Sequence, residues 1–436
     1  MEEITIAIAC ELAPAKTLIP IIKKIKKMES LGKLNWKKSK IICLTHGSGV
    51  KELLKPYCDE FYSIGKGRGS GKVKRNNFEL AYLIFKDIIK AILGLRGKGI
   101  DLLITCGNAG DVRKSISAAN LLKIPVIHIE QDIYNPIETI AFSNLVTVPS
   151  ESYKNYLSEK YHIDSTENIQ GYPMVNYIVD YVNNNYLLDN EGVKKEYDFS
   201  NFILIVLGGD LKTSDIKKLI NILERINLPT LIAPYRFKKE LIENMIKSNK
   251  IKVLDEFVDL LSLMKSSNLM IYGAGMGMTI EAGVLEIPSI KIAGFHKEHG
   301  SVDLANNLKI PILEIEEISD FLDEFKDNYQ DKYNHENKHT HENEHDDKYK
   351  DNHEDNDKYK DNYEDKNSYD DKYEDYVLNM LKNKLPTPES EKLIKNSEFA
   401  VEDFVNIINN FNLKNPPKKS GLKAMKAIWK KRSEFR

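Results

Sequence analysis

Glycines and acidic residues gather at a few points in this sequence where an apolar run gives way to a helical pattern. The clearest is YGAGMGMTIE, from Tyr272 to Glu281, which follows the apolar run NLMIY. Glycines let the backbone approach a ligand closely, and the free N–H groups at the start of the next helix favour a diphosphate. Glu281 falls about one turn inside that helix, where a carboxylate can accept both hydroxyls of a ribose. The alternative is a tight turn that only serves packing. The candidate nucleotide-binding residues here are Gly273, Gly275, Gly277, Met278, Thr279 and Glu281.

Two further turns follow apolar runs in the same way. Gly208, Gly209 and Asp210 come after FILIVL, and their glycines free a loop for a phosphate or a sugar, although Asp210 could equally cap a helix. The second turn follows LLITC, and it offers hydrogen bonds to a sugar or an acceptor or, alternatively, a plain helix cap. Its candidate residues are Gly107, Asn108 and Asp111.

Three carboxylates are candidates for acid–base catalysis, because a carboxylate at the end of a strand can have its pKa tuned by its surroundings. Glu130 ends the run IPVIHIE and Asp132 follows it, whereas His128 inside this run is expected to be structural. Glu11 follows the first apolar run and could act as a base towards an acceptor hydroxyl or cap the first helix.

Two other features do not predict a site. The basic, glycine-rich loop Gly65–Arg75 lacks the strand–GxxxxGK[ST]–helix order of a phosphate-binding P-loop, and we interpret it as a loop able to contact an anionic acceptor. Histidines with irregular spacing lie in a low-complexity tract, so no metal site is predicted. They are His335, His339, His341, His345 and His353.

The elements that position these residues alternate between short apolar runs and helical patterns. Continuous Val/Ile/Leu strands between helices are typical of a parallel sheet covered on both faces. The pattern lapses around 177–200, which we interpret as a hinge, and then restarts. The sequence therefore predicts an α/β protein with two doubly wound, Rossmann-like domains and a cleft between them, over residues 1–178 and 201–326. A longer amphipathic helix is expected over Phe78–Leu93.

The rest of the chain differs in composition. Residues 327–375 repeat DKY, NHE and YKDN units with almost no aliphatic side chains, so we expect a disordered insertion. Residues 376–412 should form helices that pack back, with Ser397–Phe411 crossing onto the first domain. Residues 413–436 form a basic tail, which is either solvated or in peripheral contact with an anionic membrane.

Composition bounds the class of protein. The formal net charge of −2, from 63 basic and 65 acidic residues, argues against a dedicated nucleic-acid binder. The apolar run near the N-terminus is too short for a signal peptide or a membrane span, so a soluble, cytoplasmic protein is expected. The four cysteines show no metal-type spacing and should be reduced. They are Cys10, Cys43, Cys58 and Cys106.

The second domain resembles the C-terminal half of GT-B nucleotide-sugar glycosyltransferases such as the cell-wall N-acetylglucosaminyltransferase. The matching features are the Gly208–Gly209 turn, the segment Asp255-Glu-Phe257, and the turn carrying Glu281 before Pro288. The resemblance implies that Glu281 binds the ribose of UDP, that the turn holds the diphosphate and that the segment near Phe257 lines the base. Arg236 is a further candidate for the diphosphate.

The first domain is more similar to UDP-N-acetylglucosamine 2-epimerase. IPVIHIE matches that family's strand ending in His-Val-Glu, and Cys106-Gly-Asn108 stands where the epimerases have His-Gly-Asp. However, the epimerase aspartate is Asn108 here, the arginine after the glutamate is Tyr134, and no His-Arg-x-Glu-Asn segment follows the first strand of the second domain. Of the groups that epimerisation needs, only Glu130 persists.

These comparisons of motifs predict a glycosyltransferase that uses a UDP-linked nucleotide-sugar as donor, with no metal or other cofactor. The first domain would hold a small-molecule or lipid-linked acceptor, with Glu11 or Glu130 as base. The alternatives are an epimerising or hydrolysing nucleotide-sugar enzyme and a non-catalytic scaffold of the same fold. The sequence does not identify the oligomeric state.

Overall fold

The computed structural model describes residues 2–434 except 66–76, 109, 133, 185, 189, 200, 209–210, 236, 256–257, 274, 295–298 and 326–387. The predicted insertion over 327–375, most of the Gly65–Arg75 loop and the five histidines therefore lie outside the described residues. Among the described residues, no helix is both long and apolar enough to cross a membrane.

The first domain is built on a seven-stranded, wholly parallel sheet in the order β3-β2-β1-β4-β5-β6-β7. Its central strands are almost entirely buried, because helices cover both faces, and this explains their continuous apolar sequences. The strands are β1 Glu3–Ala9, β2 Lys38–Thr45, β3 Glu60–Ser63, β4 Leu102–Cys106, β5 Val126–Ile129, β6 Leu145–Val148 and β7 Thr166–Asn168. The helices are α1 Leu12–Ser30, α2 Ser48–Leu54, α3 Asn77–Leu95, α4 Gly110–Leu121, the 3₁₀-helix η1 Glu138–Phe142, α5 Glu151–Tyr161 and α6 Pro173–Asn183.

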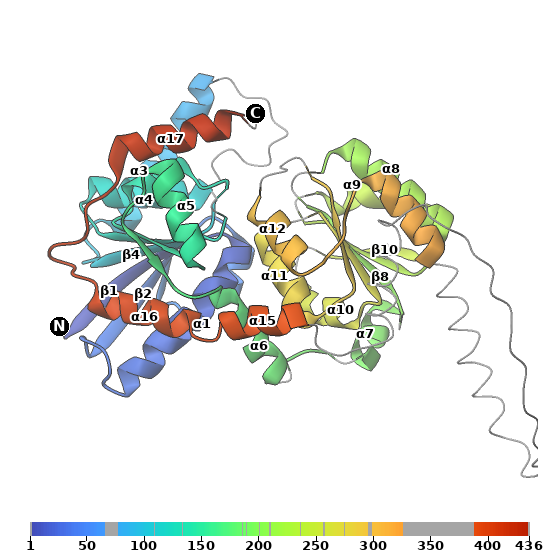
Figure 1. Cartoon of the computed structure of the whole chain (residues 1–436), viewed down its shortest axis with the longest axis horizontal. Coiled ribbons are helices and arrows are strands. Elements are labelled where there is room, and N and C mark those ends of the chain that lie inside the picture. The colour runs from blue at the N-terminus through green and yellow to red at the C-terminus, as the bar shows by residue number, and fades with distance from the viewer. Residues whose placement is uncertain are drawn as a thin grey trace, which may run out of the picture.

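The second domain repeats this arrangement with six parallel strands in the order β10-β9-β8-β11-β12-β13. The predicted α/β fold with two Rossmann-like domains is confirmed (Figure 1). The strands are β8 Ile203–Val206, β9 Thr230–Ala233, β10 Ile251–Val253, β11 Leu269–Tyr272, β12 Ser289–Ile292 and β13 Ile312–Leu313. The helices are α7 Asn190–Tyr197, α8 Thr213–Ile226, α9 Lys239–Glu243, α10 Leu260–Ser266, α11 Met276–Leu285, α12 Gly300–Asn307 and a helix over 315–325.

Three helices complete the chain: α15 Pro388–Asn396, α16 Ala400–Asn410 and α17 Gly421–Glu434. The first packs on α11 of the second domain, and α16 places Val401, Phe404 and Ile408 in the core beside α1 of the first domain (Figure 1). The segment 413–436, expected as a basic tail, contains α17, whose Ala424 and Ile428 are fully buried against the first domain.

Local expectations differ from the structure at two places. The polar stretch interpreted as a hinge contains α7, which Val193 anchors in the second core. The helix expected over Phe78–Leu93 is present as α3, and Phe78, Tyr82 and Phe85 on it point to solvent rather than into the core. Tertiary packing determines both the presence of α7 and the side of α3 that faces solvent. A local sequence pattern does not show which face of a helix packs against the rest of the protein.

Candidate functional site

The carboxyl ends of the two sheets lie on either side of the start of α1. The position that a Gly277 side chain would occupy is 3.6 Å from Ala13 and 3.6 Å from Met174, so α11 of the second domain touches α1 and α6. In doubly wound folds ligands bind at the carboxyl ends of the strands, where the strand order reverses. Here both reversal points, β1/β4 and β8/β11, precede the loops that carry predicted residues.

The start of α11 has the backbone of an anion site. Its N-cap is Gly275, and no side chain caps the free N–H groups. Tyr272 donates a hydrogen bond to Thr279 (3.1 Å), and Thr279 donates to the Gly275 carbonyl (3.4 Å), so these side chains fix the turn. Thr279 is therefore engaged within the protein, and the ligand contacts available here come from the backbone.

The two predicted glycine turns of this domain lie against each other. A side chain on Gly273 would come within 3.0 Å of Leu211 and 3.2 Å of the Gly208 nitrogen. A side chain here would require the loops after β8 and β11 to move apart by a few tenths of an ångström, so glycine allows their close approach. Met278 is half-buried and packs on the second core.

Glu281 is buried and paired across the domain boundary. Its Oε1 accepts a hydrogen bond from the Lys16 ammonium of α1, and the carboxylate side chain is only 3% exposed. Among the described residues, none hydrogen-bonds to Oε2. A ribose at this position would therefore share the carboxylate with Lys16.

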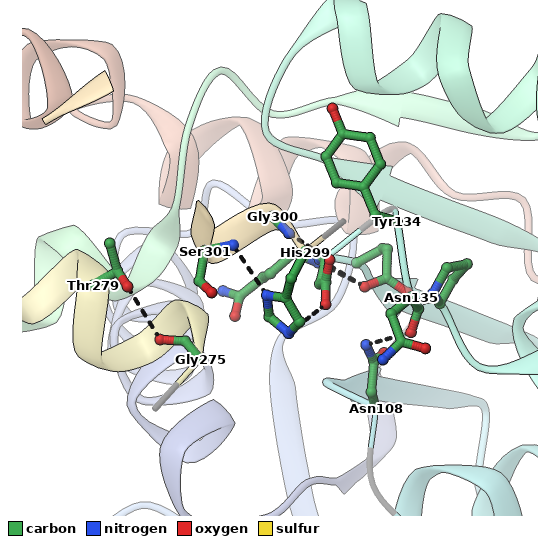
Figure 2. Close-up of polar contacts among 12 residues, drawn as sticks. Asn108, Tyr134, Asn135, Gly275, Thr279, His299, Gly300 and Ser301 are labelled. Atoms are coloured by element: carbon green, nitrogen blue, oxygen red, sulfur yellow. Dashed lines mark hydrogen bonds and ion pairs between the residues drawn. The ribbon is translucent and has the colours of Figure 1, made fainter. Parts of the chain in front are cut away.

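A second contact between the domains involves Asp132 and the start of α12. Gly300 donates its backbone N–H to Asp132 Oδ1 (2.9 Å), and His299 Nε2 lies 2.8 Å from Oδ2. His299 Nδ1 accepts from the Ser301 N–H (3.1 Å), which fixes the ring (Figure 2). The ring lies 3.4 Å from where a Gly275 side chain would stand, so His299 links the two loops.

Tyr134, which stands in place of the epimerase arginine, makes a third contact between the domains. Its hydroxyl donates to Asp303 of α12 at 2.6 Å. Burial and the hydrogen bond to Asp303 raise the pKa of Tyr134 well above its ordinary value, so the phenol stays protonated.

Buried polar atoms without partners gather where β4 and β5 end. Asn108 Oδ1, His128 Nε2 and Glu130 Oε2 are inaccessible to solvent and have no hydrogen-bond partner among the described residues. His128 Nε2 lies 3.4 Å from Glu130 Oε2, too far for a good hydrogen bond. Such unpaired buried groups are uncommon in proteins, and a polar ligand at this edge would satisfy them. Glu130 Oε1 is already occupied by the N–H groups of Gln131 and Asp132.

A histidine that the sequence analysis missed forms a dyad with Asp111. His46, directly after β2, places Nδ1 2.7 Å from both oxygens of the fully buried Asp111 carboxylate, and its backbone N–H donates to Oδ2 at 3.1 Å. Lys114 lies 3.6 Å from the same carboxylate. The hydrogen bond to Asp111 raises the pKa of His46, and the nearby charge of Glu11 adds to the shift.

The dyad leaves the other ring nitrogen of His46 available. The His46 side chain is 27% exposed, and no described residue hydrogen-bonds to Nε2. A histidine oriented by a buried carboxylate is an arrangement suited to a general base.

The predicted residues thus fall into three groups. Glu11, Asn108, Asp111, Glu130 and Asp132 lie at the carboxyl edge of the first sheet, with Gly107 held close to Pro14 by a positive φ of 86°. Gly208, Gly273, Gly275, Gly277 and Glu281 lie at that of the second sheet. Gly209, Asp210, Arg236 and Phe257 lie outside the described residues. Lys16, His46 and His299 were missed, because their partners are distant in sequence and no spacing signals them.

Solved structures with this fold include several UDP-N-acetylglucosamine 2-epimerases. One, from Methanocaldococcus jannaschii in complex with UDP-N-acetylglucosamine and UDP, is 18% identical with a TM-score of 0.57, over 74% of this chain and 92% of that one. Another, from Neisseria meningitidis bound to UDP-N-acetylglucosamine, is 17% identical with a TM-score of 0.55, over 73% of this chain and 90% of that one. The S. aureus MnaA–UDP co-structure is 12% identical with a TM-score of 0.53, over 71% of this chain and 82% of that one.

No curated protein matches the chain. The model of one protein family, described as "Protein of unknown function (DUF354)", matches residues 118–341, which is more than half of the chain.

Proposed function

The chain belongs to the DUF354 family, and from the geometry of its two facing sheets we propose that it binds a nucleotide-sugar, with UDP as the nucleotide, and transfers the sugar to an acceptor. The observation that carries the proposal is the set of unpaired buried polar atoms at the ends of β4 and β5, together with the uncapped start of α11. Structures of the same fold are described with UDP or UDP-N-acetylglucosamine bound.

The second domain would hold the donor. The diphosphate would accept hydrogen bonds from the backbone at Gly275 and Gly277, where the helix dipole stabilises negative charge without a metal. Glu281 Oε2 would accept the ribose hydroxyls while Oε1 stays with Lys16. A ligand bound this way contacts residues of both domains.

The first domain would hold the acceptor and remove its proton. His46 is the base that the geometry favours, because Asp111 orients its ring and Nε2 has no other described partner. Glu130 is less suited, since its carboxylate is buried and one oxygen already binds two backbone N–H groups. Glu11 remains the alternative, because it lies beside His46 at the N-cap of α1.

Transfer is favoured over epimerisation by the residues at two positions. Asn108 cannot act as the acid or base that an aspartate supplies, and its Nδ2 is committed to the Asn135 carbonyl. Tyr134 stays a neutral phenol bonded to Asp303 in the position of the epimerase arginine.

The binding step is tested by thermal unfolding with UDP, GDP, CMP or TDP. UDP should stabilise the wild type, by about 2.7 kcal/mol at a hundred times its Kd, and Glu281→Gln should lose that stabilisation. If none of the four nucleotides shifts the unfolding temperature, the proposal is wrong.

The reaction is tested by incubating the protein with UDP-N-acetylglucosamine and no acceptor. A transferase should leave the substrate essentially unchanged until an acceptor is added. Rapid release of UDP, or formation of an isomer, would instead identify an epimerising or hydrolysing enzyme. A scaffold that binds UDP without turning over any nucleotide-sugar would show stabilisation alone.

A further inference from the structure

One face of α3 carries a continuous stripe of large apolar side chains in solvent. Phe78, Tyr82, Phe85, Ile89 and Leu93 are exposed by 88, 64, 63, 40 and 65%, respectively. Their spacing of four, three, four and four residues places them on one side of the helix. On the opposite side Asp87 is buried, and Ala91 and Leu95 belong to the core of the first domain.

The stripe is too large to be ordinary surface. Three of the five residues are aromatic, and an aromatic side chain has about 150–250 Å² of surface. With the exposed fractions given above and the two aliphatic residues included, the stripe presents roughly 600 Å² of apolar surface. Monomeric proteins seldom expose contiguous apolar patches above a few hundred Å², and larger ones mark interaction sites. Rotation of the helix to bury this face would expose Ala91 and Leu95, which are buried on the inner side.

The order of the side chains is nearly symmetric about the middle of the helix. Phe78 and Leu93 lie equally far from the Phe85–Lys86 midpoint, and Tyr82 and Ile89 do as well. Two copies of α3 packed antiparallel around a two-fold axis at this midpoint would therefore match apolar residues along the whole stripe. Such self-matching is what an isologous interface requires.

The charged residues beside the stripe suit the same arrangement. Glu79 lies on the flank that also carries Lys86 and Lys90, at the opposite end of the helix from Lys90. Antiparallel packing brings Glu79 of one copy towards Lys90 of the second copy, where opposite charges favour the register. A lipid surface would gain nothing from this order of charges.

We infer that α3 is the centre of a homodimer interface, in which the exposed stripe of one chain packs antiparallel on that of a second copy. The apolar area offered by the stripe is most of the roughly 800 Å² that each partner contributes to a standard interface. Neighbouring α4 adds to it, because Leu121 at its C-terminus is 69% exposed and α4 packs alongside α3. The inference does not depend on the proposed nucleotide-sugar activity.

The test is the molar mass in solution of the full-length protein, measured by sedimentation equilibrium or light scattering from 1 to 50 μM. The wild type should have twice the chain mass of 50.0 kDa. Phe85→Glu, at the two-fold axis, should be monomeric or weaken the dimer at least a hundredfold. Phe85→Glu should keep the circular dichroism spectrum of the wild type, because the Phe85 side chain is exposed.

A matched pair of leucines controls for the general effect of adding charge. Leu93→Glu alters the stripe, where Leu93 is 65% exposed. Leu31→Glu alters a leucine at the C-terminus of α1 that is 57% exposed. Leu93→Glu should weaken the dimer and Leu31→Glu should not. A monomeric wild type, or a dimer that survives Phe85→Glu, would overturn the inference.

A membrane is the competing occupant, and sedimentation with vesicles of phosphatidylcholine and phosphatidylserine distinguishes it. The dimer should remain in the supernatant. Sedimentation of wild type but not of Phe85→Glu, from a solution in which both are monomeric, would assign the stripe to a lipid surface and refute the dimer. The effect of UDP on thermal unfolding should be the same in Phe85→Glu as in wild type, whichever result is obtained.

Discussion

The two sheets share a strand order but differ in what stands at their carboxyl edges. The edge of the second sheet is lined by glycine turns at Gly208, Gly273 and Gly275, and it offers backbone N–H groups. The edge of the first sheet carries ionisable side chains, including His46 and Asp111. A backbone-lined edge suits a ligand of fixed charge, whereas titratable side chains can move protons. In the proposed function, the two halves of the fold thus divide binding and proton transfer between them.

The largest expected effect concerns proton transfer at the first edge. His46→Asn should lower turnover of a nucleotide-sugar by about 10²- to 10⁴-fold, the usual contribution of a general base. The stabilisation by UDP should be unchanged, because the second edge is intact. Turnover and UDP-induced unfolding shifts measured on one preparation check both halves of the statement.

The matched control is His162→Asn, at the exposed C-cap of α5, where φ is 56° and asparagine is well tolerated. It should retain full turnover. Equal losses in both variants would remove His46 from the proposed chemistry.

The next effect concerns the ion pair that joins the two edges. Lys16→Met should lower the free energy of unfolding by about 1–3 kcal/mol, because it leaves the buried Glu281 carboxylate without its charged partner. Lys23→Met on the same helix also breaks an ion pair, Lys23–Asp180, but both of those side chains are over 40% exposed. Its cost should stay below about 1 kcal/mol.

Urea denaturation of the two variants measures the contrast. The double variant Lys16→Met with Glu281→Gln should recover part of the loss, since no buried charge is then unpaired. If the Lys16 and Lys23 variants lose equal stability, the pair between the domains has no special role.

A smaller effect is expected from crowding the second edge. Gly277→Val should weaken UDP binding about tenfold, or about 1.4 kcal/mol, because its extra methyl groups fill the space between α11 and Ala13. Gly277→Ala should keep the wild-type affinity, because its Cβ fits at 3.6 Å. Isothermal titration calorimetry compares the three proteins, and identical affinities would place the diphosphate elsewhere.

The smallest effect is a dependence of stability on pH. The pKa of His46 is raised in the folded state by its hydrogen bond to Asp111, so folding favours the protonated ring. The resulting stability is complete below the unfolded-state pKa of about 6.5 and disappears as pH rises through the folded-state value. The difference in unfolding free energy between wild type and His46→Asn should therefore shrink from pH 5.5 to pH 9. A constant difference would exclude the charged pair.

The sequence predicted the fold well because parallel strands buried on both faces leave unbroken apolar runs, as in β4 and β8. It also indicated which loops carry the candidate site, because glycines and acids after such runs stand at one edge. The sequence could not indicate which side chains pair with one another in the folded protein. Lys16 and Glu281 are 265 residues apart, and His46 and Asp111 are 65 apart.

A local sequence pattern also could not predict which side of α3 is exposed to solvent. Its period shows that apolar residues share one side, but both the inner and the outer side satisfy that period. The outer side carries the stripe because the inner side uses small residues, such as Ala91, against the sheet. The helix α7 was not predicted, because its sequence is mostly polar. One buried residue, Val193, was enough to anchor it.

The chain passes between the two domains at least twice among the described residues, and these passes touch. At Gly171–Tyr172 it leaves the first sheet, and at Ser397 it returns from α15 to α16, with Ser397 Oγ accepting from the Tyr172 N–H at 3.1 Å. Gly171, with φ of 121°, has no room for a side chain there, because it would meet the Ser397 backbone at 2.6 Å. The chain runs in opposite directions through these two connections, and the hydrogen bond between Ser397 and Tyr172 ties them together. A movement of one half relative to the other would therefore pivot near this crossing, where both connections lie.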